Sequence, residues 1–368
     1  MNPDGIFVLT LPGSLTYMSP ELKDLNGCIL DTLKSVFRSV KIIPGDVNLY
    51  LASNSNYLEK VTLQEITNRL EERKIKTGLF TKGYLEFRLD ERWMKWFSQS
   101  MEGRGVKINS DFRPLAVFLS LSYWNALFSP YLTGIFKWFE GFSVRISIAF
   151  VTFLILLIAI IFIWKPLVSR QSIPYVIFTT GLAGMIFNLS VIFTFQTFYG
   201  YLYRQIGLLI AIFMFGVALS SFYMTQRLEK IKRDSLVFLN IEIAIILFSF
   251  LFPFIFAIPS QYLEKTAVSY LLYSVFLVMS FLSGAWLGLQ FPLATKIYLV
   301  TSPKSGTLGY TAGLLYGADL MGGFLGGLFG GILLLPILGL KESCLVIGMI
   351  KISSLASLLL FMKNYKSP

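Results

Sequence analysis

The chain has 368 residues, of which 55% are hydrophobic and 14% are charged, and its formal net charge is +11. One soluble core cannot bury so much apolar surface, so the composition predicts a multi-pass membrane protein with basic loops. The sequence contains no histidine, and its two cysteines, Cys28 and Cys344, lie far apart. A metal site and a disulfide framework are therefore not expected. Nucleic-acid binding is not expected either, because the sequence contains no array of basic and aromatic residues.

The first 108 residues predict a small α/β region. Residues 6–11 form an apolar, β-prone run that Pro12 and Gly13 end, and Ser19 with Pro20 has the pattern of a helix start. The helix is expected to run to about Phe37. Two further short apolar runs, 40–43 and 47–52, flank a turn and predict a hairpin. Additional helices are predicted over residues 61–73 and 89–101.

Several stretches of the sequence resemble one family. MNPDGIFVLTLPGSLTYMSPELKDLNGCILDTLKSVF and VKIIPGDVNLYLAS resemble the last third of the Rossmann-like catalytic domain of membrane-fused spermidine synthase-like proteins, and INSDFRPLAVFLSLSYWNALFSP resembles the segment that ends this domain. The later stretches GLAGMIFNLSVIFTFQTFYGYLYRQIGLLIAIFMFGVALSS, GLQFPLA and GLLYGADLMGGFLGGLFG resemble their membrane part. The resemblance covers most of the chain, although no single piece of it is a catalytic signature.

The resemblance implies aminopropyl transfer from decarboxylated S-adenosylmethionine to putrescine or a similar diamine. In that family the donor-binding glycines and acids and the catalytic aspartate precede the strand at residues 6–11, so no catalytic residue and no cofactor site is assigned here. We therefore expect the C-terminal portion of a longer protein, inactive without its N-terminal half. The strand end at Pro12, Gly13, Ser14 and Tyr17 is the substrate-binding candidate, because ligands of such folds bind at the carboxyl edge of the sheet. An ordinary turn is the alternative.

Residues 109–145 predict a junction between the α/β part and the membrane part. The uncharged run 115–136 carries Trp124 and Tyr131, which suit headgroup depth, and Pro130, which interrupts a helix. An interfacial or re-entrant pair of short helices fits this pattern, and a membrane span is the alternative.

Residues 146–362 predict an all-α transmembrane bundle of about seven helices. The apolar segments are residues 146–164, 173–197, 206–224, 236–258, 266–291, 309–335 and 343–362. The loops on the membrane side of Lys165 and Arg170 carry more Lys and Arg than the loops on the opposite side. By the positive-inside rule the richer side faces the cytoplasm, which would put residues 1–108 outside the cell. A further span at 115–136 would reverse this, and we expect an inner cell membrane protein whose soluble part is cytoplasmic.

The segment around Asp319 is rich in glycine. Small residues at helical spacing allow close helix packing in lipid, and the candidates are Gly313, Gly317, Gly323, Gly326 and Gly330. Asp319 shares a helix face with three of these glycines, so it is predicted to point into a helix–helix contact. It would then serve as structural glue or as a functional intramembrane acid.

Three other polar residues lie within the apolar segments. These are Asn188, at a position where the resembled family carries a glutamate, Glu242, and Lys351. Gln196 and Gln290 lie near segment ends. A direct pair of Lys351 with Asp319 is not expected, because their depths differ by about 15 Å at about 1.5 Å per residue. Lys351 is instead expected to snorkel or to meet backbone carbonyls. For each of these residues, interhelical hydrogen bonding is the alternative to ligand binding.

Two functions besides the enzyme remain open. The membrane part can be a transporter-like module that moves or senses a polyamine or another small cation, or a structural anchor in the lipid bilayer.

Overall fold

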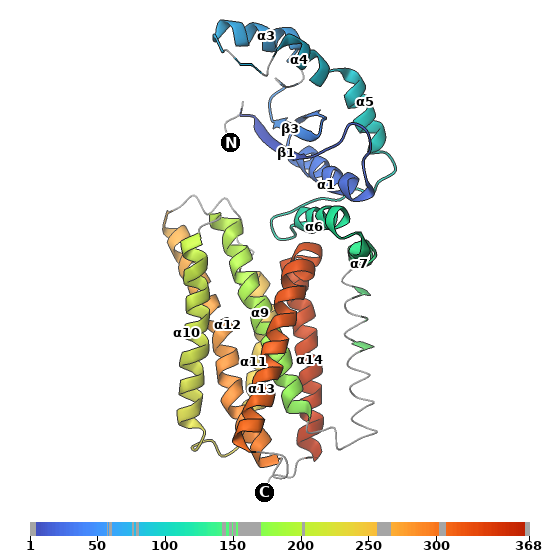
Figure 1. Ribbon diagram of the computed structural model, residues 1–368. Helices are drawn as coiled ribbons and strands as arrows, with labels where there is room; N and C mark the ends of the chain where they lie inside the picture. Colours follow the sequence, from blue (N-terminus) through green and yellow to red (C-terminus); the bar gives the residue numbers. More distant parts are fainter. Residues whose placement is uncertain are drawn as a thin grey trace. The chain divides into compact units, whose positions relative to one another are not determined.

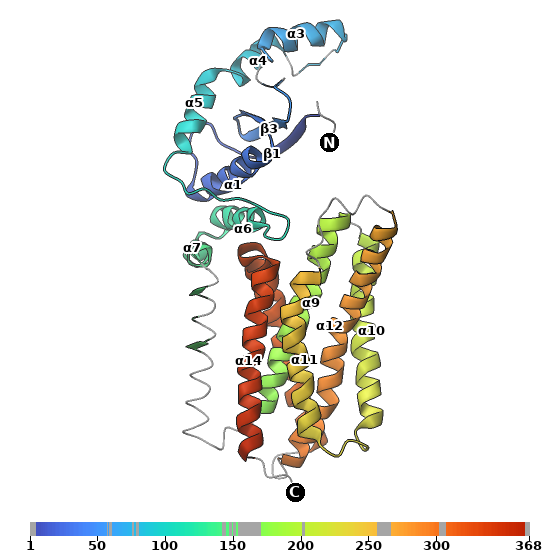
Figure 2. The ribbon, with the colours of Figure 1, turned by 180° about the vertical axis from the view of Figure 1, so that it is seen from behind.

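The computed structural model describes residues 5–56, 58, 61–75, 77–78, 81–141, 145–146, 149, 152–153, 171–200, 203–255, 266–301 and 307–364. The chain divides into two compact units, residues 1–110 with 114–138 and residues 111–113 with 139–368. Figures 1 and 2 draw the two units from opposite sides, and each unit is described below by itself.

The first unit is built on a sheet of three strands, β1 (Phe7–Pro12), β2 (Ser39–Ile43) and β3 (Val47–Ser53). The order is β1-β3-β2, and β3 runs antiparallel to both neighbours. The predicted hairpin is confirmed, with Ile42 opposite Tyr50 and Ile43 opposite Leu49. Since β3 is antiparallel to both other strands, β1 and β2 run parallel to each other.

Helix α1 (Pro20–Val36) connects β1 to β2. It begins as predicted, because the Ser19 side chain accepts a hydrogen bond from the Leu22 amide and Pro20 takes the first helical position. The core of the unit joins apolar side chains of α1, β3 and α5, among them Leu22, Leu30, Tyr50 and Phe97.

Five further helices lie among the described residues of the first unit, the last of which ends two residues beyond it. They are α3 (Leu63–Glu72), α4 (Lys82–Arg88), α5 (Glu91–Ser100), α6 (Leu115–Phe128) and α7 (Thr133–Glu140), with the 3-10 turn η1 (Pro130–Leu132) between the last two. Helix α6 ends just before Pro130, and at about 1.5 Å per residue it extends for about 21 Å. That length is short of the roughly 30 Å of a hydrocarbon core.

The second unit contains six helices that are long and apolar enough to cross a membrane among the residues described. They are α9 (Ser172–Tyr199), α10 (Tyr203–Arg227), α11 (Asp234–Ile255), α12 (Thr266–Thr301), α13 (Leu308–Phe329), which continues into the π-helical η4 (Gly330–Leu338), and α14 (Leu340–Asn364). Six of the predicted apolar segments match these helices. The seventh, residues 146–164, falls mostly outside the described residues.

Helix α9 is the most deeply buried helix of this bundle and packs against α12, α13 and α14 (Figure 1).

Two prolines affect the neighbouring helices differently. Helix α12 continues through Pro292 to Thr301, further than predicted, since a membrane helix tolerates a proline when neighbours satisfy the freed carbonyl. Around Pro336 the helix widens to π geometry, which relieves the clash of the ring with the preceding turn.

Candidate functional site

An ion pair lies at the centre of the helix bundle. The Lys351 Nζ on α14 is 2.7 Å from the Glu242 Oε1 on α11, and both side chains are fully buried. Lys351 lies about 16 Å along α14 from Leu340 and about 20 Å from Asn364 at about 1.5 Å per residue. Both distances equal or exceed half of a roughly 30 Å hydrocarbon core, so a bilayer centred on α14 would have the pair near its middle.

Side chains of two further helices complete the cluster. The Gln290 amide on α12 donates to the Glu242 Oε2 at 2.7 Å, and the Thr180 hydroxyl on α9 donates to the Gln290 Oε1. The Lys351 ammonium in turn donates to the Thr180 hydroxyl at 2.9 Å. Because every member is held by at least two others, the network fixes the positions of four helices relative to one another.

Hydroxyl groups continue the polar contact along the interface of α9 and α14. The Ser354 hydroxyl donates to the Glu242 Oε1. The hydroxyls of Tyr175 and Ser353 lie 2.7 Å apart, and the Ser357 hydroxyl donates to the Ser172 hydroxyl at 3.0 Å. Polar contacts thus extend from the ion pair to the first residue of α9.

Two of the sequence-based candidates come together in this site. Glu242 and Lys351 form the pair, and the expectation that Lys351 snorkels or meets backbone carbonyls is wrong, because a carboxylate and two threonine hydroxyls hold it. Sequence reasoning named Gln290 only as a polar residue near a segment end. It missed Thr180 and Ser354, because isolated hydroxyl residues in an apolar run carry no signal of what they contact.

Asp319 and Asn188 lie elsewhere. Asp319 on α13 is half-buried against α9, and its Oδ1 would be 2.7 Å from a Cβ added to Gly181. Asn188 is buried on α9, and its Oδ1 has no hydrogen-bond partner among the described residues. Neither residue joins the ion-pair cluster.

The candidate packing glycines of α13 behave in two ways. A Cβ on Gly326 would lie 2.6 Å from the Leu182 carbonyl oxygen of α9, and one on Gly330 would lie 2.8 Å from the Ile186 side chain. A Cβ on Gly323 would lie 4.0 Å from the Gly181 carbonyl oxygen of α9. A Cβ on Gly313 or Gly317 would meet no atom of another element within 4 Å among the described residues. The closest contact of α13 belongs to Gly322, whose added Cβ would lie 2.0 Å from the Phe178 carbonyl oxygen of α9.

The strand end of the first unit is shaped by a buried polar group. The Asn26 side chain of α1 donates to the Pro12 carbonyl and accepts from the Asn48 amide at 2.9 Å and the Tyr50 hydroxyl at 2.7 Å. A Cβ on Gly13 would lie 2.3 Å from the Gly45 carbonyl oxygen, so only glycine fits this crossing.

The residues that follow this strand end face solvent. The Ser14 hydroxyl accepts hydrogen bonds from the backbone amides of Thr16 and Tyr17, which closes a turn. The Tyr17 side chain is 71% exposed. Of the candidates at the carboxyl end of β1, Gly13 is therefore packed against the neighbouring turn and Tyr17 is open to solvent.

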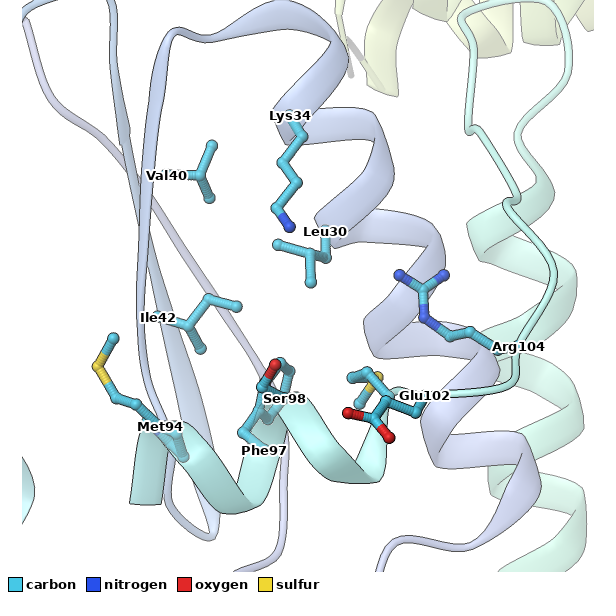
Figure 3. Close-up of a pocket in the computed structure, with 11 residues that line it drawn as sticks. Leu30, Lys34, Val40, Ile42, Met94, Phe97, Ser98, Glu102 and Arg104 are labelled. Carbon is cyan, nitrogen blue, oxygen red and sulfur yellow. The ribbon is translucent and has the colours of Figure 1, made fainter. Parts of the chain in front are cut away.

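A cavity of about 350 Å³ lies between α1, β2 and α5 (Figure 3). Apolar side chains such as Ile42 and Met94 line it together with Lys34, Glu102 and Arg104. The Arg104 guanidinium donates to both Asp31 carboxylate oxygens, at 2.5 and 2.7 Å. These hydrogen bonds hold the pKa of Asp31 below its usual range. The Arg104 guanidinium at this cavity is therefore already paired.

The described residues contain no group of three or more His, Cys, Asp or Glu side chains that could hold a metal ion. Burial raises the pKa of the Cys28 thiol to about 11, so this thiol is unreactive at neutral pH.

Comparisons of the chain with protein-family models, with curated proteins and with solved structures found no match. The class of the protein therefore rests on its own structure. Among the described residues, six helices of spanning length beside a small α/β unit indicate a multi-pass membrane protein.

Proposed function

We propose that the chain is the C-terminal part of a membrane-bound, spermidine synthase-like aminopropyltransferase. In this proposal the first unit belongs to a Rossmann-like, methyltransferase-type domain, and the helix bundle anchors that domain in the membrane. The missing N-terminal half would bind decarboxylated S-adenosylmethionine and supply the catalytic groups, so this chain by itself is inactive.

The strand arrangement of the first unit carries the proposal. Strands β1 and β2 run parallel and are connected by α1, which is the strand–helix–strand unit of doubly wound sheets. Strand β3 is an antiparallel member between them, as mixed sheets of this class allow.

The free edge of the sheet gives a second line of support. Strand β1 has a single hydrogen-bonded neighbour among the described strands. Ile6, Phe7 and Val8 expose 44%, 37% and 55% of their surface, and alternate residues of a strand point to opposite faces. Apolar side chains on both faces are typical of a strand that helices cover on both sides. Further strands and helices beside β1 would bury these side chains.

An activity assay tests the proposal. The sequence encoded upstream of Met1 is expected to contain a glycine-rich strand–loop–helix followed by acidic strand ends. The longer protein, purified in detergent, is expected to make spermidine from putrescine and decarboxylated S-adenosylmethionine, whereas residues 1–368 are not. Spermidine formation by residues 1–368 alone, or none by the longer protein, would refute the proposal.

Two variants locate the amine site in the longer protein. Tyr17→Ala is expected to lower kcat/KM for the diamine, because Tyr17 lies at the carboxyl edge of the sheet. Val36→Ala, also at an exposed position, is the matched control and should have no effect. Equal activity of both variants would remove Tyr17 from the site.

The proposal includes a location in the inner cell membrane, with the first unit in the cytoplasm where the substrates are. A cysteine introduced at position 36 tests this, because the native Cys28 and Cys344 are buried. We expect a membrane-impermeant maleimide to label it in inside-out vesicles but not in intact cells. Labelling in intact cells would place the unit outside.

A second candidate function is a membrane module that moves or senses a cationic solute, and the ion pair between Glu242 and Lys351 favours it. Charged groups near mid-membrane are costly and commonly mark pathways for ions or protons. Uptake of labelled putrescine into vesicles that contain the wild-type chain tests this function, with empty vesicles as the control. Uptake no faster than that of empty vesicles would exclude it for this solute.

A further inference from the structure

The surroundings of the Lys351 ammonium are those of a complete ligand site. Its Nζ lies 2.7 Å from the Glu242 Oε1, 2.9 Å from the Thr180 hydroxyl and 3.4 Å from the Thr179 hydroxyl. A primary ammonium group has three N–H donors and no acceptor. Three acceptors, one of them charged, therefore match one primary ammonium group in number and in charge.

These acceptors are held in place by groups other than Lys351. Gln290 bridges the site, because its amide donates to the Glu242 carboxylate and its carbonyl oxygen accepts from the Thr180 hydroxyl. Because the single proton of the Thr180 hydroxyl is donated to Gln290 or to the Val176 carbonyl, its oxygen acts as an acceptor toward the ammonium. Ser354 donates to the Glu242 Oε1, the oxygen that also pairs with Lys351. A site whose acceptors are already oriented loses little entropy when a ligand enters.

We infer that Glu242, Thr179 and Thr180 form a binding site for a primary ammonium group, and that Lys351 occupies this site as a ligand carried by the chain itself. An alkylamine or diamine in its ammonium form enters by replacing Lys351. The exchange leaves the charge of the site unchanged, because one ammonium leaves as another arrives. This inference names the binding site of the second candidate function and rests on that function for where the amine comes from. Binding of an amine can still be measured in the absence of transport.

The hydroxyl pairs between α9 and α14 connect this site with the start of α9. Ser172 with Ser357 and Tyr175 with Ser353 lie between the start of α9 and Thr179. The distance along α9 from Ser172 to Thr180 is about 12 Å at about 1.5 Å per residue. The Tyr175–Ser353 pair, one helical turn from Thr179, offers acceptor oxygens to a displaced Lys351 ammonium.

The test uses the full chain in detergent and a ligand that fills the space left by a substitution. Lys351→Ala removes three methylenes and the ammonium, which together correspond to n-propylamine. Equilibrium dialysis with labelled n-propylamine is expected to give a Kd for K351A that is lower than that of the wild type by about tenfold or more, because the tethered competitor is gone. The amine should also raise the Tm of K351A, whereas n-propanol at the same concentration should not.

The double variant E242Q/K351A is the matched control and is expected not to bind n-propylamine, because the charged acceptor is lost. Equal affinity of K351A and the wild type, or equal affinity of K351A and E242Q/K351A, would overturn the inference. If K351A aggregates without ligand, recovery of a monodisperse protein in n-propylamine supports the inference. Aggregation that persists in n-propylamine, while the neutral pair E242Q/K351M is monodisperse, would overturn it. Binding to K351A without putrescine uptake by wild-type vesicles would uphold the site and refute the transport function.

Discussion

The stability of the helix bundle is expected to depend strongly on Glu242. Its carboxylate accepts hydrogen bonds from Lys351, Gln290 and Ser354, and all of its surface is buried. Glu242→Gln keeps the shape but replaces one acceptor oxygen with an NH₂ donor. In either orientation of the new amide, this donor faces another donor, and the Lys351 cation loses its countercharge.

The size of the effect follows from the loss of one partner of a buried ion pair, which costs about 3–5 kcal/mol. For a unit of roughly 200 residues, about 2–4 °C of Tm corresponds to each kcal/mol, so E242Q should melt roughly 6–20 °C below the wild type. The assay is thermal unfolding in detergent, followed by tryptophan fluorescence.

The neutral pair E242Q/K351M provides the control, since replacing both charges of a buried pair is often neutral or stabilising. It is expected to melt within about 2 °C of the wild type or above it. If E242Q itself melted at the wild-type temperature, the ion pair would carry no stability and the reasoning would be refuted. A double variant as unstable as E242Q would show that the packing of the side chains, and not their charges, matters.

Three further predictions concern helix packing and the first unit. Gly322→Ala should lower the Tm of the bundle, because its Cβ would lie 2.0 Å from a backbone oxygen of α9. Gly317→Ala is the control and should leave the Tm unchanged, because its Cβ would meet nothing within 4 Å among the described residues. Equal Tm values of the two variants would contradict this packing. The hydrogen bonds from Arg104 lower the pKa of Asp31 in the folded state. The ionised Asp31 carboxylate therefore stabilises the first unit at any pH above the usual carboxylate pKa of about 4. This stabilisation is lost as the pH falls through the folded-state pKa. The protection factors of the α1 amides, which are corrected for the intrinsic pH dependence of hydrogen exchange, should therefore fall in acid in the wild type but change less with pH in Asp31→Asn. Identical profiles would refute the assignment. Asn26→Ala should destabilise the first unit by about 1–3 kcal/mol, because buried hydrogen-bonding groups lose their partner, and chemical denaturation measures this; an unchanged midpoint would contradict it.

The sequence alone determined the class of the protein and most of its local structure. Apolar runs of spanning length have few structures open to them, because a backbone in lipid must satisfy its own hydrogen bonds, and this predicted the helices of the bundle. Short-range signals were equally reliable where the physics is local. The Ser19–Pro20 helix start and the hairpin around Pro44 and Gly45 depend on residues a few positions apart.

Only the tertiary structure decided which polar residues meet. Glu242 and Lys351 are separated by more than a hundred positions, and their contact depends on how α11 and α14 are rotated about their axes. An apolar helix in lipid has no solvent-facing side, so the sequence pattern does not fix that rotation, and a glycine-rich face is the strongest clue. That clue predicted a contact for α13 and placed Asp319 near α9, but the ion pair formed on helices that carry no such face.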